Sequence, residues 1–134
     1  MKYICVFALV LTMLFTTGCT EKNYPPPTKY TIENVLRIEL LDTSSNEEIL
    51  LKTITEDELK VFWDSFIQIE FRRYLNDPPT QYGAKAVRIV YSDGWEDIIG
   101  TDINGRYKDG KSQAVGWYYL ADADAYKNLF ANYL

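Results

Sequence analysis

Residues 86–99 read AVRIVYSDGWEDII, and the predicted fold depends most on this stretch. Val87, Ile89 and Tyr91 recur at every second position and therefore fall on one face of a β-strand. The Asp-Gly dipeptide at 93–94 is favoured in two-residue hairpin turns, so the residues after it are expected to return as the partner strand. A turn this short joins only antiparallel strands, which argues against a parallel sheet.

Two further strands and a helix are predicted before this hairpin. Residues 36–40 alternate between apolar and polar side chains, and residues 49–54 follow a polar turn at 43–48 as a second strand. Thr55 and Glu58 then form the capping-box pattern that starts helices. After it, apolar residues recur at the spacing of one helix face: Leu59, Phe62, Trp63 and Phe66.

The remaining elements are predicted from shorter signals. Alternation over residues 68–75 indicates a strand that ends at the prolines of 77–79. Asn104-Gly105 and Asp109-Gly110 indicate two further turns, and residues 115–119 a last strand.

A C-terminal helix completes the predicted fold. Asp122 is its expected N-cap, and its apolar stripe consists of Tyr126, Leu129, Phe130 and Tyr133. The order is two strands, a helix, three or four strands and a helix. It predicts an α+β two-layer sandwich, with an antiparallel sheet of about five to six strands and both helices on one face.

The first nineteen residues have the pattern of an export signal. Lys2 precedes an apolar run at 4–15 that is shorter than the roughly 20 residues a membrane span needs, and small residues at 16–18 then precede Cys19. This pattern resembles the lipobox of bacterial lipoproteins, although Thr16 stands where that family usually has leucine. An ordinary secretory signal with a cysteine near the cleavage point is the alternative.

The resemblance implies a specific organisation of the chain. Residues 1–18 would be a signal peptide, and Cys19 would carry a diacylglycerol that anchors the exported protein to the cell membrane or the outer membrane. Residues 20–29, TEKNYPPPTK, are expected to form a spacer together with Cys19, because consecutive prolines favour an extended chain. A single domain would then occupy residues 30–134, similar in pattern to small lipoprotein domains of unknown function.

Composition argues against several classes of function. The chain of 134 residues has a net charge of −5, which repels phosphate backbones, so no nucleic-acid partner is expected. It has no histidine, the commonest general base and metal ligand. Asp93, Asp97, Asp102 and Asp109 cluster in the hairpin region, but aspartate is favoured at turns for backbone reasons. We therefore predict no catalytic residue, cofactor site or metal site.

Aromatic residues are the remaining candidates for a functional surface. Trp95, Trp117 and Tyr118 lie beside glycines, and we expect some of them to be exposed on a surface that binds a ligand. The alternative is that they cover the open face of the sheet. The leading hypothesis is a non-catalytic binding module of the cell envelope that recognises a protein or a glycan.

Two other functional hypotheses stay open. One is a small hydrolase of envelope polymers that uses a pair of carboxylates such as Asp97 and Asp102. The other is a structural envelope protein, or an inhibitor that protects the cell from an enzyme.

Overall fold

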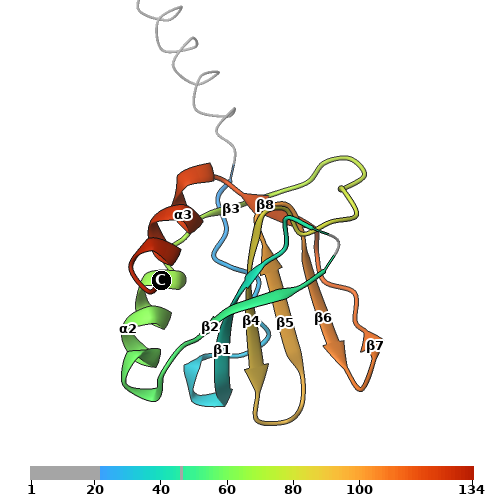
Figure 1. Ribbon diagram of the computed structural model, residues 1–134. Helices are drawn as coiled ribbons and strands as arrows, with labels where there is room; N and C mark the ends of the chain where they lie inside the picture. The colour runs from blue at the N-terminus through green and yellow to red at the C-terminus, as the bar shows by residue number, and fades with distance from the viewer. Residues whose placement is uncertain (1–21, 46) are drawn as a thin grey trace, which may run out of the picture.

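The computed structural model describes residues 22–134 except residue 46. Its elements, in chain order, are η1 (Ile32–Asn34), β1 (Val35–Asp42), β2 (Ile49–Thr53), α2 (Glu56–Phe66), β3 (Phe71–Arg73), β4 (Lys85–Tyr91), β5 (Glu96–Gly100), β6 (Asn104–Lys108), β7 (Lys111–Ser112), β8 (Tyr118–Leu120) and α3 (Ala123–Ala131). Six strands form an antiparallel sheet in the order β2-β1-β4-β5-β6-β7, and β3 and β8 form a separate two-stranded sheet (Figure 1). The predicted α+β class is confirmed.

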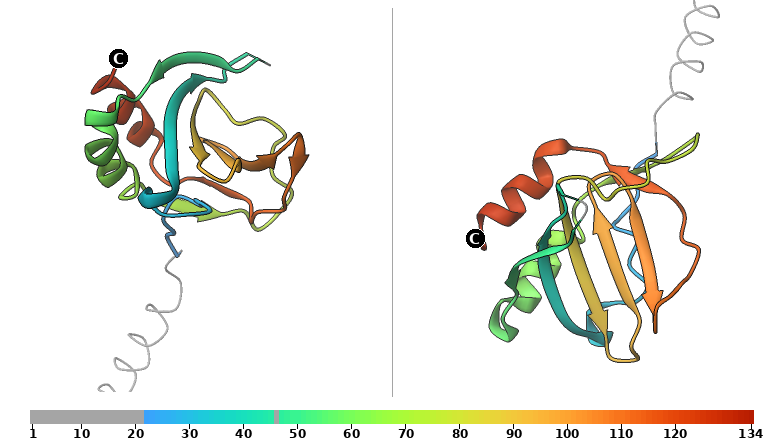
Figure 2. Two further views of the ribbon diagram at one scale, coloured as in Figure 1. Left: turned by 90° about the horizontal axis from the view of Figure 1, so that it is seen from below. Right: turned by 45° about the vertical axis from the view of Figure 1, so that its right-hand side comes forward.

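Both helices lie beside the same face of the curved six-stranded sheet (Figures 1 and 2). Apolar side chains of β1, β4 and β5 meet those of α2 and α3 in one core, which buries Ile38, Leu40, Val87, Ile89, Ile99, Phe62, Phe66, Tyr126 and Phe130. Removing this much apolar surface from water is the main force that holds the two layers together.

The helices begin and bury their side chains as the sequence predicts. The backbone N–H of Thr55 donates to Glu58 Oε2 at 3.1 Å, which completes one half of the predicted capping box. The backbone N–H of Asp124 donates to the side chain of Asp122 at 2.9 Å, so Asp122 caps α3. The buried residues of both helices are Phe62, Trp63, Phe66, Tyr126, Leu129 and Phe130.

The strand predicted over residues 68–75 is mostly wrong. Only Phe71–Arg73 is a strand, and it pairs with β8 rather than with the main sheet. Leu75, the last apolar residue of the alternation, is 93 % exposed. The partner of β3 lies more than forty residues away in the chain, and local alternation carries no information about such a pairing.

Of the two turns predicted after β5, one is confirmed and one is wrong. Asp109 and Gly110, with φ of 50° and 75°, join β6 to β7 in the left-handed conformation that tight hairpins require. Asn104-Gly105 instead begins β6. A Cβ at Gly105 would lie 2.6 Å from the hydroxyl oxygens of Tyr82 and Tyr107, so this glycine allows two tyrosines to approach the backbone.

Residues 22–29 lie along the domain and do not form the expected spacer. Tyr24 and Phe71 exchange two backbone hydrogen bonds of 2.8 Å, which adds Tyr24 to the edge of β3. Pro26 is buried, and its neighbour Pro27 accepts a hydrogen bond from Arg106 at 3.2 Å. Residues 1–21, which include the predicted signal peptide and Cys19, lie outside the described residues. No helix within residues 22–134 is long and apolar enough to span a bilayer.

Candidate binding surfaces

Asp97, which the alternative hydrolase hypothesis would use, is a buried structural residue. It lies on β5 and is 1 % exposed. Its Oδ1 accepts a hydrogen bond from Arg106 Nε at 2.6 Å, and its Oδ2 accepts from Tyr91 OH at 2.5 Å and from the backbone N–H of Lys29 at 2.7 Å. Burial, and then the adjacent carboxylate, raises the pKa of Tyr91, so its hydroxyl keeps the proton that it donates. Asp97 therefore connects the N-terminal segment to the sheet.

The other carboxylates of the hairpin region do not converge on Asp97. Asp102 lines a separate depression that also includes Thr43 and Gly83. Asp93 accepts hydrogen bonds from Tyr30 OH at 2.6 Å and from the backbone N–H of Trp95 at 3.1 Å, as turn aspartates often do. The pair proposed for hydrolysis, Asp97 and Asp102, therefore does not face one shared cleft.

A row of ion pairs crosses the sheet face opposite the helices. The register aligns Glu39 of β1 with Arg88 of β4, and Arg88 NH1 lies 2.8 Å from Glu39 Oε2. Arg88 also pairs with Glu48, and Arg37 Nε lies 2.9 Å from Glu39 Oε1. Burial raises the pKa of Glu39, but the hydrogen bonds from the two arginines outweigh it, so the pKa lies below its usual value.

Two tyrosines cover the apolar end of this open face. Tyr82 OH and Tyr107 OH are 2.6 Å apart, and both rings pack against a small buried cluster that contains Leu41, Ala86 and Ile98. Burial and the hydrogen bond to Tyr107 raise the pKa of Tyr82. The pair shields from water the second, smaller core that the curvature of the sheet creates.

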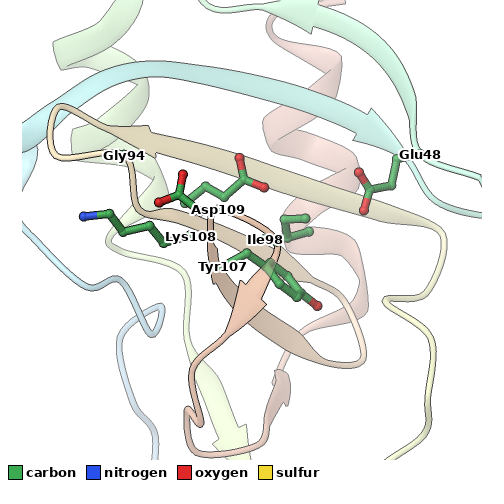
Figure 3. A pocket seen from close by; sticks show the side chains of 8 residues that line it. Glu48, Gly94, Ile98, Tyr107, Lys108 and Asp109 are labelled. Carbon is green, nitrogen blue, oxygen red and sulfur yellow. The ribbon is translucent and has the colours of Figure 1, made fainter.

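A depression of about 440 Å³ lies beside Tyr107 on the same face. Figure 3 shows Glu48 at one side, Lys108 and Asp109 at the other, and Tyr107 with Ile98 between them. Charges of both signs next to an aromatic ring suit a ligand that offers hydroxyl or amide groups. Within the described chain, no group of three or more cysteine, aspartate or glutamate residues is placed to hold a metal ion.

The three aromatic residues singled out from the sequence lie at two ends of the molecule. Trp95 follows the β4–β5 turn and is half-buried, with Lys29 Nζ 4.6 Å from its ring centroid. Trp117, 47 % exposed, directly precedes β8, and Tyr118 is its first residue. Strand β8 lies at the opposite end of the sheet (Figure 1). Tyr118 packs edge-on against Tyr24 at 5.3 Å. These residues do not combine into one ligand surface.

The chain matches no family model, no curated protein and no solved structure.

Strand β2 is a candidate surface that the sequence did not reveal. Its neighbour in the sheet is β1 alone, so it forms one edge. Ile49, Leu50 and Leu51 are 48 %, 54 % and 38 % exposed. A strand was predicted here, but its edge position follows from pairings between distant residues. Consecutive exposed apolar side chains along a sheet edge are uncommon, because such edges attract other strands.

Proposed function

We propose that this protein is an exported lipoprotein, anchored through Cys19, whose domain is a non-catalytic module that binds an extended segment of a partner protein along β2. The export and anchoring part is supported by the lipobox-like pattern of residues 1–19. The binding part is carried by one observation, the exposed apolar edge of β2.

The chemistry of β2 favours an extended peptide as the ligand. The outer side of an edge strand offers backbone N–H and C=O groups, which a second strand can pair, while alternate side chains give specificity. Natural edges are often protected by a lysine. Here the Lys52 ammonium lies 3.0 Å from Glu58 Oε1 on α2, so it is turned toward the helix and leaves the edge accessible. An inhibitor role is included in this proposal, with an enzyme as the partner.

A glycan is the second candidate ligand, favoured by the depression beside Tyr107. Tyrosine rings stack on sugars, and Lys108 and Asp109 supply a donor and an acceptor for hydroxyl groups. Hydrolysis is less favoured, because Asp97 is fully engaged and has almost no access to solvent.

Lipid anchoring is tested by mass spectrometry and by fatty-acid labelling of the full chain in a bacterial host. We expect the mature protein to begin at Cys19, to carry diacylglycerol and to fractionate with membranes. The Cys19→Ser chain should take up no label. Finding residues 1–18 still attached to the wild-type protein, or label on the Cys19→Ser chain, contradicts the proposal.

Partner binding is tested with a photoreactive residue at Leu50. The control carries the same group at Val61, an exposed apolar residue of α2. We expect one discrete protein adduct from Leu50 and none from Val61, and we expect Leu51→Lys to abolish it, because an exposed lysine opposes strand addition. Equal adducts at both positions refute binding along β2. If no adduct forms at Leu50, and Tyr107→Ala abolishes binding of a labelled envelope glycan that the wild type binds, then the ligand is a glycan instead.

A further inference from the structure

The position of the N-terminal segment limits how the domain can be oriented, if Cys19 is anchored as proposed above. Tyr24 is bonded to β3 by two backbone hydrogen bonds. It follows Cys19 by five residues, which span roughly 17 Å when fully extended. The end of the domain that carries β3 and β8 is therefore held close to the bilayer. We propose that the outward face of the β3–β8 pair lies on the headgroup region of that bilayer.

The register of β3 and β8 determines which side chains face outward. Phe71 and Leu120 are paired and buried, so they point into the core. Their neighbours Arg72 and Tyr119 are paired one position further and fall on the opposite side. Beyond them, the backbone N–H of Tyr74 donates to the carbonyl of Trp117 at 3.0 Å. The outward face thus consists of Arg72, Tyr74, Trp117 and Tyr119.

This outward face has the composition of a membrane interface. The rings of Tyr74 and Tyr119 pack with centroids 4.6 Å apart, and Trp117 is 47 % exposed. Leu75, 93 % exposed, continues the same surface beside a depression of about 590 Å³. Tryptophan and tyrosine are enriched at headgroup level, because their apolar rings and polar tips suit that layer, and a leucine can reach the acyl chains.

Charge contributes less than the aromatic and apolar side chains. Lys22, Arg72 and Arg73 line the same depression, and they would favour anionic headgroups in a chain whose net charge is −5. Glu70 and Asp77 lie in the same chain segment and offset part of this attraction. We therefore assign the contact to Leu75, Trp117 and the two tyrosines whose rings pack together, Tyr74 and Tyr119.

The proposal is tested by tryptophan fluorescence of the lipidated protein in vesicles of phosphatidylethanolamine and phosphatidylglycerol with brominated acyl chains, which quench nearby tryptophans. Trp95 lies between β4 and β5, whose connecting turn is at the end of the sheet away from β3 and β8 (Figure 1), and it serves as the internal control. We expect quenching in the wild type and in Trp95→Phe, and none in Trp117→Phe. Quenching that persists in Trp117→Phe overturns the proposal.

A second pair of variants tests the same contact without changing a fluorophore. Leu75→Glu should lower the quenching of Trp117 about twofold or more, because a carboxylate is poorly accommodated among acyl chains. Leu36→Glu is the matched control, since Leu36 is 63 % exposed at the start of β1, at the far end. Equal effects of both variants overturn the proposal. Failure of the wild type to carry lipid refutes the anchor instead, so the two failures are distinguishable.

Discussion

Replacing Arg106 by methionine removes the guanidinium from a carboxylate that water cannot reach. Asp97 is 1 % exposed and the Arg106 side chain 13 % exposed, with 2.6 Å between Nε and Oδ1. Methionine keeps much of the apolar stem of arginine, so the variant tests the charge more than the packing. The two hydrogen bonds from Tyr91 OH and the Lys29 backbone N–H remain in place.

The expected loss follows from the cost of leaving a buried charge without its partner. Breaking a buried ion pair on one side costs about 3–5 kcal/mol. The two remaining donors still stabilise the carboxylate, so we expect the lower end, about 3 kcal/mol of unfolding free energy. With a urea m-value of about 1.5 kcal/mol per molar, the midpoint of unfolding should fall by about 2 M.

A double-mutant cycle separates the ion pair from other effects. Asp97→Asn, Arg106→Met and the double variant are unfolded in urea, and we expect a coupling energy of about 2 kcal/mol. Arg37→Met is the matched control: its guanidinium also pairs with a carboxylate but is 48 % exposed, so it should lose less than about 1 kcal/mol. A coupling energy below about 0.5 kcal/mol, or an equal loss in the control, refutes the reasoning.

Three further predictions concern the helix cap, the open sheet face and a glycine with a positive φ. Thr55→Ala removes the N-cap of α2 and should lower the unfolding free energy by about 1 kcal/mol in urea titrations. An unchanged unfolding free energy would show that Thr55 does not stabilise the helix as a cap. The pKa of Glu39 is depressed, so its contribution is present above pH 4.5 and is lost as pH falls through the folded pKa. Glu39→Gln should therefore flatten the fall in stability on acidification, and an identical pH profile would contradict this. Gly83 has φ of +92°, and a Cβ there would come within 2.0 Å of a threonine hydroxyl, whereas Gly110, with φ of +75°, faces open space. Gly83→Ala should lower the thermal midpoint well below that of Gly110→Ala, which carries only the backbone cost of about 1 kcal/mol, and equal midpoints would refute the steric argument.

The elements predicted correctly are those whose signals are local. The capping box of α2 spans four residues, and the stripes of both helices repeat within one or two turns. The hairpin of β4 and β5 is predicted correctly from its alternation and from Gly94, which has a positive φ of 91°. The turn itself has three residues, 92–94, rather than the predicted two, because the backbone N–H of Tyr91 donates to the carbonyl of Trp95. In each case the interacting residues are close together in the chain, so the local sequence pattern is enough to predict their contact.

The errors concern contacts between distant residues. Nothing near Phe71 indicates that its partners are Tyr24 on one side and Leu120 on the other. The prolines before Lys29 suggested a free spacer, yet the segment is held by Asp97, which lies 68 residues further along the chain. Propensity describes what a segment does alone, and burial against a preformed sheet overrides it.

The candidate surfaces were harder to predict than the elements. An aspartate in the otherwise apolar strand at 97–99 is a signal for a buried pair, and the β5–β6 register does place Asp97 opposite Arg106. The exposure of Leu50 had no such signal, because ILL at 49–51 equally suits a central strand. Only the order of strands in the sheet decides between these two environments.

The proposed contact of β3 and β8 with the bilayer and the proposed binding of a partner along β2 are related, because residues 22–29 pack on the domain instead of forming a free spacer. If β3 and β8 lie on the bilayer, the strands of the main sheet extend away from it, and β1, with eight residues, reaches about 26 Å. The β2 edge runs beside β1, so a segment that pairs with β2 must come within about that distance of the membrane surface. A lipid on a free tether would restrict only where the protein is. If the lipid is joined to a segment held by Phe71 and Asp97, as proposed, it also restricts which way the domain faces, and binding along β2 would then select partners that are themselves at the membrane.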